Sequence, residues 1–368
     1  MNKERTLALT TGLALFCMFF GSGNLVFPLI VGTFAGANTF WATLGLILTA
    51  VFMPLLGCIG ILLYKGEPSE FFKPLGRKGF LLFSFACLAL MGPFGVLARC
   101  LTVAHGTFIY VMPDVSLATF SLVSCILLFG AALFRDQIMK LLGNWLTPLL
   151  LLSLGGIFVF CLLNAAVKTT IETTVWEAFA MGSSQGYQTM DLMASLFFSG
   201  FVIAQLRTQT ENSSVMMRVF FRAVIVAGLL LATVYAGLVF LGFQYSALLT
   251  EVSPQSMLAT IVLHVLGTWG GAVVCVAFAL ACYTTALVLT VLFSDFIRKE
   301  FVNNKVPEWS TLLLTLVCAF AISTLDFSGI AEFLAPILET SYPFLIAFTV
   351  WNIVRALWSP SPKMAISE

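Results

Sequence analysis

Apolar residues occupy long stretches of this chain, separated by short polar segments. A helix needs ~20 mostly apolar residues to cross the roughly 30 Å hydrocarbon core of a bilayer. Ten stretches meet that length and are predicted as membrane-spanning helices, and a further short helix is expected at 256–265 on the outer surface. The predicted spans are 7–34, 39–64, 79–112, 116–134, 140–163, 189–206, 218–243, 266–297, 309–325 and 331–353.

The composition agrees with an all-α membrane protein. Hydrophobic residues make up 60% of the chain and charged residues 10%, with a mean hydropathy of +1.02. Soluble domains carry about 25% charged residues, so most of this surface is expected to face lipid. The net charge of +1, without a basic tract, excludes nucleic acid as the main partner. The nine cysteines lie in apolar stretches without Cys-x-x-Cys spacing and are interpreted as buried hydrophobic residues.

The distribution of basic residues predicts the orientation. Apart from Lys168 and Arg99, every lysine and arginine falls on one side of the membrane if the N-terminus is on that side. Cytoplasmic loops carry such an excess. Both termini are therefore predicted to be cytoplasmic, and residues 354–368 are expected to form a short cytoplasmic tail.

The predicted spans divide into two groups of five. Residues 7–163 hold the first group and 189–353 the second, with a polar outer loop between them. Because five is odd, a duplication would place the second group upside down, as in the inverted repeats of many secondary transporters. The hypothesis is a single transmembrane domain made of a 5+5 inverted repeat. An unduplicated protein of ten helices is the alternative.

The first span contains the sequence Gly21-Ser22-Gly23-Asn24 near its middle, followed by Pro28. Glycine costs about 1 kcal/mol relative to alanine in a helix interior, and unpaired backbone groups in lipid cost several kcal/mol each. A broken helix around a protected cavity is therefore predicted here. The amides of Ser22, Gly23 and Asn24 would suit a substrate carboxylate, and carbonyls before the break a cation. A packing face of small residues or a proline kink would explain the same pattern.

The first helix of the second group repeats this feature. Gly186 lies before a short apolar run, and Asp191 is predicted near the outer end of the span. Asp191 is interpreted as a cation ligand, a proton carrier, a solvated carboxylate or a helix-capping residue. Ser195, Phe197 and Phe198 follow on the same helix and are expected to line the substrate pocket, a phenylalanine forming its wall.

The eighth span carries two adjacent hydroxyls, Thr284 and Thr285, in an aliphatic setting. Neutral oxygens of this kind can replace the hydration shell of a monovalent cation. Threonines in membrane helices also donate to carbonyls of their own helix, which is the simpler explanation.

Arg99 is the only lysine or arginine predicted deep in the membrane, away from the ends of a span. A charge at that depth costs ~2.5 kcal/mol or more unless it is paired or hydrated. Arg99 is predicted to act as a gate residue, with Asp191 as its outer partner. Alternatively its side chain extends to the outer interface.

Three motifs resemble those of the bacterial branched-chain amino acid transport system II carriers, which are cation-coupled symporters. They are Gly-x-Gly-Asn-Leu-x-Phe-Pro at 21–28, Gly92-Pro93 with Arg99, and Gly-Tyr-x-Thr-Met-Asp at 186–191. The resemblance covers nearly the whole chain. It implies a leucine-transporter-type fold with helices 1 and 6 broken, and a bacterial inner-membrane location.

The resemblance also implies a sodium site and no organic cofactor. In sodium symporters of that fold, carbonyls before the Gly-x-Gly-Asn motif bind the ion together with the eighth helix. Carried onto this chain, the implied ligands are Cys17, Phe20, Ala281, Thr284 and Thr285. The coupling cation could also be a proton or lithium.

The chain departs from the family pattern at two positions beside Arg99. Relatives usually carry proline before this arginine and glutamate seven residues after it, where this chain has Ala98 and Gly106. Any coupling role of that glutamate is therefore absent or moved.

Three function classes follow. The first is a symporter that imports leucine, isoleucine or valine together with a cation, sodium being favoured, by alternating access. The second is a transporter or channel for another small solute, because a fold does not fix a function. A membrane-embedded enzyme is the third, and no zinc-protease motif or nucleotide-binding loop supports it.

Overall fold

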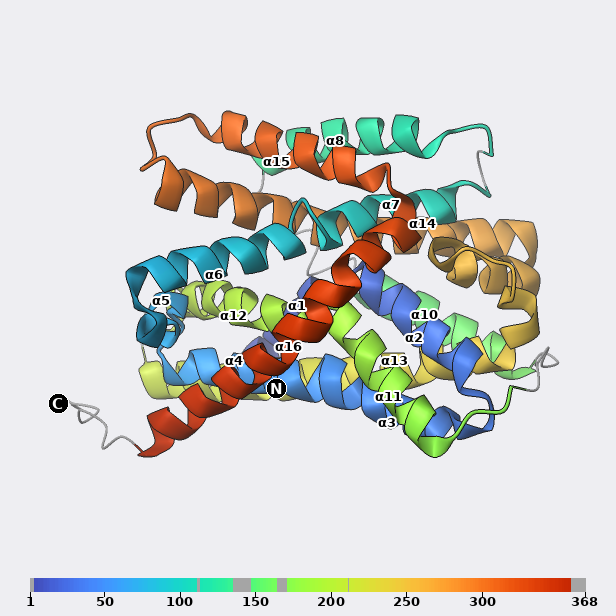
Figure 1. Ribbon diagram of the computed structural model, residues 1–368, viewed down its shortest axis with the longest axis horizontal. Helices are drawn as coiled ribbons and strands as arrows, with labels where there is room; N and C mark the ends of the chain where they lie inside the picture. The colour runs from blue at the N-terminus through green and yellow to red at the C-terminus, as the bar shows by residue number, and fades with distance from the viewer. Residues whose placement is uncertain (1–2, 111–112, 135–146, 164–170, 211, 359–368) are drawn as a thin grey trace.

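The computed structural model describes residues 3–110, 113–134, 147–163, 171–210 and 212–358. Throughout these ranges the regular structure is helical, with no strand (Figure 1). Helices satisfy their own backbone hydrogen bonds, which an apolar membrane requires. The start of the predicted fifth span and the last ten residues of the predicted tail lie outside the described residues.

The helices of the first half begin and end close to the predicted spans. They are α1 Lys3–Phe19, α2 Ser22–Ala35, α3 Thr39–Ile47, α4 Met53–Leu63, α5 Pro68–Phe71, α6 Gly76–Met91, α7 Val96–Phe108, α8 Leu117–Leu133 and α10 Thr147–Leu163. A π-helical segment, η2 Leu48–Phe52, joins α3 to α4.

The second half holds the longer helices. They are α11 Val175–Gln188, α12 Asp191–Arg207, α13 Ser213–Gln244, α14 Met257–Phe296, α15 Glu308–Ser323 and α16 Asp326–Trp358. Within α14, Gly267 has a non-helical backbone (φ 68°), so α14 consists of two helices, one on each side of that residue. This agrees with the predicted short helix at 256–265 followed by a span from 266.

Two features differ from the sequence prediction. Residues 175–188 were expected in a polar outer loop but form helix α11, whose glycines and polar residues hid its helical character. The third span was expected to be continuous but is interrupted at 92–95, between α6 and α7. Five described helical stretches are long and apolar enough to cross a membrane, or six with the bent pair α11 and α12. The count of ten crossings stays a prediction.

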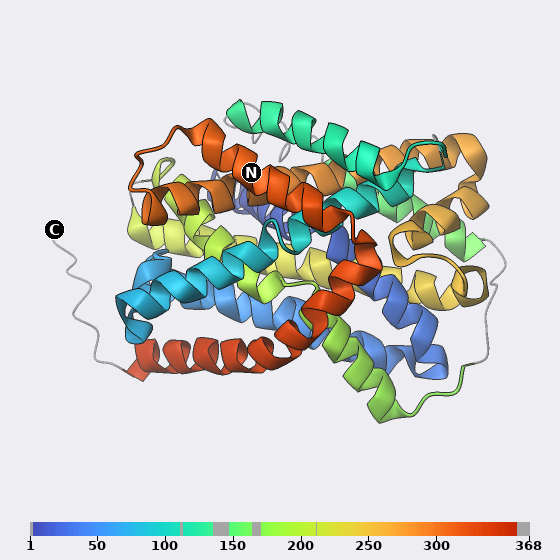
Figure 2. The ribbon, with the colours of Figure 1, turned by 45° about the horizontal axis from the view of Figure 1, so that its top comes forward.

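Helices far apart in the sequence pack in a repeated pattern. The pair α1 and α2 packs along α13, while α11 packs on α3 and α12 on α4. Helix α7 packs on α14, and α8 lies beside α15 at one edge of the molecule in both views (Figures 1 and 2). Each of these pairs joins the two predicted halves. The first span (α1 and α2) packs on the seventh (α13), and the sixth span (α11 and α12) packs on the second (α3 and α4). Such reciprocal pairing is what an inverted repeat produces.

Small residues allow α11 and α3 to approach closely. A Cβ atom on Gly182 would collide with the carbonyl of Ala42, and one on Gly45 with the carbonyl of Phe179. A Cβ atom on Gly186 would collide with the Thr49 side chain. Helices in membranes use such small-residue faces to bring their backbones together.

Substitution of Gly186 by alanine is expected to force α11 away from α3. Overpacking of this kind costs about 1–3 kcal/mol, so the purified protein should unfold at a lower temperature. Gly130→Ala is the matched control, because a Cβ atom there meets nothing within 4 Å. Thermal unfolding in detergent measures both variants, and equal stability of the two would contradict this account of the α11 and α3 contact.

Candidate functional site

The first interruption of the backbone lies between α1 and α2. Helix α1 ends at Phe19 and α2 begins at Ser22. The amide of Gly21 donates to Asn24 Oδ1 at 3.2 Å, so the asparagine side chain replaces a missing backbone acceptor. The first amides of a helix have no acceptor within it. Those of Ser22, Gly23 and Asn24 therefore have no acceptor within α2, and the Ser22 amide contacts the Cys100 thiol.

The second interruption lies between α11 and α12. Helix α11 ends at Gln188, α12 begins at Asp191, and the two are bent by 40° relative to each other. Met190 has a left-handed backbone, with φ 60° and ψ 18°. A bulky residue is uncommon in that conformation, so surrounding contacts must hold it there.

Hydrogen bonds join the two interruptions. Asn24 Nδ2 donates to Asp191 Oδ2 at 2.8 Å, and the Tyr235 hydroxyl on α13 donates to the same oxygen at 2.8 Å. Asn24 Nδ2 also contacts the Tyr235 hydroxyl. The sequence placed Asp191 near the outer end of its span, but its side chain is 2% exposed and lies inside the bundle. The interpretation of Asp191 as a solvated residue is therefore wrong. Helix α11 precedes it, so Asp191 lies at the junction of two helices and not at the end of the span.

Arg99 is positioned by the interruption of the third span. A Cβ atom on Gly95 would collide with the carbonyl of Leu90, so only glycine fits where the chain turns. Helix α7 then begins at Val96, and the Arg99 amide donates to the Gly95 carbonyl at 2.9 Å. This turn places Arg99 at the start of α7, within the core.

The guanidinium of Arg99 is fully buried among neutral groups. It donates to the backbone oxygen and to Oε1 of Gln188, each at 2.8 Å. Its central carbon lies 5.1 Å from the ring centre of Phe27 and 5.5 Å from that of Phe327, distances typical of cation–π contacts. Arg99 therefore neither reaches the interface nor pairs with Asp191. Both predictions for Arg99, an ion pair with Asp191 and a side chain at the outer interface, are therefore wrong. Its hydrogen-bond partner is Gln188.

We call Arg99, Gln188, Phe27 and Phe327 together the Arg99 layer. A cavity of about 250 Å³ lies beside this layer. Three of the four layer residues line the cavity. Its remaining lining residues are Ile30, Gln185, Pro254, Ser328, Ala331, Glu332 and Ala335, all on the predicted outer side. Gln188 is the last residue of α11 and Phe27 lies one helical turn beyond Asn24, so the Arg99 layer lies next to both the cavity and the joined interruptions.

Three oxygens from two helices converge beside the end of α1. The Thr285 hydroxyl lies 3.4 Å from the Phe20 carbonyl and 3.4 Å from the Ala281 carbonyl. The Thr284 hydroxyl donates to the Ala281 carbonyl at 2.7 Å and lies 4.0 Å from Cys17 Sγ. The structure thus brings together the five residues of the implied sodium site. The Thr285 hydroxyl contacts the Phe20 carbonyl in the first span. The Thr284 hydroxyl instead donates to a carbonyl of its own helix, as threonines in membrane helices often do.

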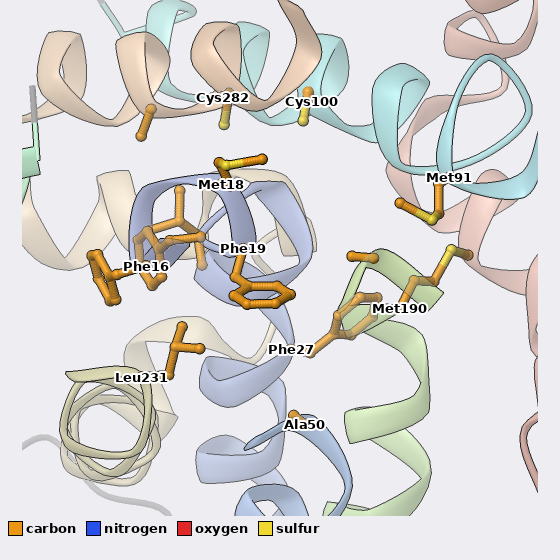
Figure 3. Close-up of a cluster of buried hydrophobic side chains, with 14 of the residues drawn as sticks. Phe16, Met18, Phe19, Phe27, Ala50, Met91, Cys100, Met190, Leu231 and Cys282 are labelled. Atoms are coloured by element: carbon orange, nitrogen blue, oxygen red, sulfur yellow. The ribbon is translucent and has the colours of Figure 1, made fainter. Parts of the chain in front are cut away.

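Two cysteine thiols lie near α1, on α7 and α14. Figure 3 shows Cys100 and Cys282 pointing from α7 and α14 toward Met18 on α1. The Cys100 thiol donates to Ser22 Oγ at 3.5 Å, which fixes the first side chain of α2. All nine cysteines are free thiols, eight of them buried, as their apolar surroundings predict.

The other predicted site residues lie farther along α12. Ser195 donates to the Leu192 carbonyl at 2.7 Å and faces Gly57 on α4. Phe197 stacks with Phe72, whereas Phe198 contacts Phe19 near the end of α1. Only Phe198 among these three is thereby placed against the first span.

Gln188 and Tyr235 were missed in the sequence. Gln188 lies between two motif residues, and nothing in the pattern connects it to Arg99. Tyr235 is a lone hydroxyl in an apolar stretch, which gives no partner. Gln188 acquires its role because the end of α11 contacts α7, and Tyr235 because α13 contacts α12. Both contacts arise only from tertiary packing.

The departure at Gly106 also has a structural counterpart. A Cβ atom there would collide with the backbone of Gln255, and the Ser256 hydroxyl donates to the Gly106 carbonyl at 3.4 Å. The segment before α14 therefore occupies the space that a glutamate side chain at position 106 would need.

The profile of the family described as branched-chain amino acid transport protein matches residues 4–367. This chain belongs to that family. The match includes the joined interruptions, the Arg99 layer and the oxygens beside α1.

Curated relatives support the assignment. The branched-chain amino acid transport system 3 carrier protein of Pseudomonas aeruginosa is 27% identical, over 97% of this chain and 82% of the relative. The branched-chain amino acid permease BrnQ of Corynebacterium glutamicum is 30% identical over the same shares. These relatives are carriers and permeases, so the chain is a multi-pass membrane transporter and not an enzyme.

Solved structures share the fold. A manganese transporter of Eremococcus coleocola has a TM-score of 0.57 at 14% identity, over 96% of this chain and 79% of its own. A Na⁺-coupled sialic acid symporter in its outward-open state has a TM-score of 0.51 at 11% identity, over 95% and 76%. The leucine-transporter-type fold class expected from the resemblance is confirmed.

Gln188→Ala is expected to weaken the Arg99 layer, because the guanidinium loses one of its two acceptors. An unsatisfied buried polar group costs about 1–3 kcal/mol, which thermal unfolding of the purified protein would detect. Gln185→Ala is the matched control, since Gln185 lines the same cavity without a bond to Arg99. Unchanged stability of the Gln188 variant would show that its amide does not hold the buried charge.

Proposed function

We propose that this chain is a secondary symporter that imports leucine, isoleucine or valine together with a cation, sodium being the best candidate. The names of its relatives support the substrate class. The observation that carries the proposal is the pair of backbone interruptions joined through Asn24 and Asp191. Helix ends inside an apolar bundle are tolerated where they line a cavity or a binding site. The protein would lie in the bacterial inner membrane with both termini in the cytoplasm.

The start of α2 would bind the substrate carboxylate. The amides of Ser22, Gly23 and Asn24 lack acceptors within the helix, and the helix dipole favours a negative group there. An added Cβ atom at Gly23 would lie 3.2 Å from Phe27 and 3.4 Å from Thr189, so a side chain there would crowd the space between the two interruptions. The substrate would thus be held between the two interruptions.

The oxygens of Phe20, Ala281 and Thr285 would hold the cation. Hydroxyl and carbonyl oxygens are ligands suited to a monovalent ion, and they come from α1 and α14. Among the described residues, no group of three or more His, Cys, Asp or Glu side chains forms a metal site. A cation bound here would tie α14 to the end of α1 and so favour one arrangement of the two helices.

Transport would follow alternating access. The Arg99 layer closes the path from the outer cavity to the joined interruptions, so substrate entry requires the Arg99 to Gln188 bonds to open. Release toward the cytoplasm would require the helices around the first interruption to move relative to α14. A transporter of another small solute is the second candidate, because the solved neighbours of this fold carry manganese or sialic acid in their names.

Gly23→Leu is expected to abolish leucine uptake in proteoliposomes while the protein still inserts into the membrane. The larger side chain would fill the space between Phe27 and Thr189 where the substrate approaches the backbone. Gly23→Ala should give an intermediate loss, since the Phe27 ring can move by a few tenths of an ångström. Wild-type uptake by the leucine variant would remove the start of α2 from the site.

Replacing Thr284 and Thr285 together by valine is expected to raise the sodium concentration that half-saturates uptake roughly tenfold or more. The shape of α14 is preserved, but hydroxyl ligands are lost. Since sodium and leucine stabilise the same state, the apparent leucine affinity should fall most at low sodium and recover partly at high sodium.

Single variants and a control sharpen that test. Thr285→Val alone should account for most of the shift, because its hydroxyl reaches the Phe20 carbonyl. Thr290→Val is the matched control, since Thr290 is buried in α14 and bonds only to the Ala286 carbonyl. If the double variant and the control require the same sodium concentration, the threonines are not ligands.

A further inference from the structure

Asp191 is the only buried carboxylate among the residues that the structure describes, and Arg99 is the only other buried charged side chain. Its neighbours within hydrogen-bonding reach are the neutral side chains of Asn24, Tyr235 and Thr189. Arg99 does not neutralise it, because the guanidinium is bound to Gln188. An ionised carboxylate in an apolar interior needs a cationic partner, since burial of an unpaired charge is costly.

Hydrogen-bond donors and a helix end around Asp191 partly offset the cost of burying its negative charge. It is the first residue of α12, where the positive end of the helix dipole lies. Asn24 and Tyr235 both donate to Oδ2. A carboxylate can accept about four hydrogen bonds, so these partners leave acceptor capacity for another donor.

Asp191 lies close to the start of α2, where the substrate carboxylate would bind. Its Oδ2 lies 2.8 Å from Asn24 Nδ2, and Asn24 belongs to the first turn of α2, where the substrate carboxylate would bind. An α-amino acid carries its ammonium and carboxylate on adjacent carbons. A molecule whose carboxylate meets the amides of Ser22 to Asn24 therefore brings its ammonium within reach of Asp191.

On these grounds we propose that Asp191 is the counter-ion of the substrate's α-ammonium, which makes it the residue that selects α-amino acids over carboxylic acids of the same shape. The inference rests on the proposed function and adds the residue that binds the ammonium group of the substrate. Asn24 and Tyr235 act as positioning residues, because they hold the carboxylate at the junction of the two interruptions. The ammonium donates N–H groups to the carboxylate, and no covalent bond changes.

The test compares leucine with isocaproate, which is leucine without its amino group, as ligands of the purified full chain at saturating sodium. In the wild type, leucine should bind far more tightly than isocaproate. In Asp191→Asn, leucine affinity should fall roughly 30-fold or more, the loss expected when one partner of a buried charge pair is removed. Isocaproate affinity should change little, so the ratio of the two affinities collapses.

Two variants serve as controls. Glu332→Gln removes a carboxylate from the outer cavity and should leave the ratio unchanged. Tyr235→Phe removes a donor but keeps the Asp191 charge, so discrimination against isocaproate should persist. If Asp191→Asn cannot be recovered from membranes, Asp191→Glu moves the charge by one methylene group. That variant should weaken leucine binding while sparing isocaproate.

An unchanged ratio in Asp191→Asn would overturn the inference. Equal losses for leucine and isocaproate are one form of that unchanged ratio, and their recovery at higher sodium would make Asp191 a ligand of the coupling cation instead. Absence of leucine binding and uptake in the wild type would instead overturn the proposed function. The wild-type measurement therefore separates the two failures.

Discussion

A helix that stops inside an apolar bundle leaves backbone groups without partners, and the rest of this structure depends on how that problem is met. Among the described residues, helices stop in this way after Phe19, after Met91 and after Gln188. Asn24 satisfies the Gly21 amide through Oδ1 and reaches Asp191 through Nδ2. One side chain thus closes the first interruption and connects it to the second, which gives the centre of the bundle a defined shape.

Neutral partners hold both buried charges. Arg99 is bound by the two oxygens of Gln188, while Asp191 is bound by donors from Asn24 and Tyr235. Hydrogen bonds of this kind satisfy a charged group without cancelling its charge. A direct ion pair in an apolar interior would be much harder to separate. The arrangement thus suits a protein whose buried charges must exchange partners during a transport cycle.

The contacts between helices differ in how much movement they allow. The α11 and α3 contact is made by glycine against backbone carbonyls at Gly45 and Gly182, which leaves no space for sliding. The contact between α1 and α14 near the implied cation site includes longer bonds, such as the 3.4 Å contact between Thr285 and Phe20. We therefore expect α11 and α3 to move as one unit, with changes of shape concentrated where α1 meets α14.

The sequence by itself determined the membrane class, the approximate bounds of most helices and the first interruption, because these follow from local composition. Twenty apolar residues predict a span, and Gly21 to Asn24 predict weakness in a helix, whatever surrounds them. The resemblance grouped Cys17, Phe20, Ala281, Thr284 and Thr285, and these residues do lie together, Phe20 and Ala281 through their carbonyl oxygens.

Only the tertiary structure decided which partners the polar residues have. The sequence suggested Arg99 with Asp191, since opposite charges attract, but the end of α11 places Gln188 against the guanidinium. It left Tyr235 unnoticed, because a lone tyrosine in an apolar stretch acquires meaning only when α13 lies beside α12. Hydrophobic periodicity specifies which residues are buried; the partner of a buried polar group depends on helices brought together from distant parts of the chain.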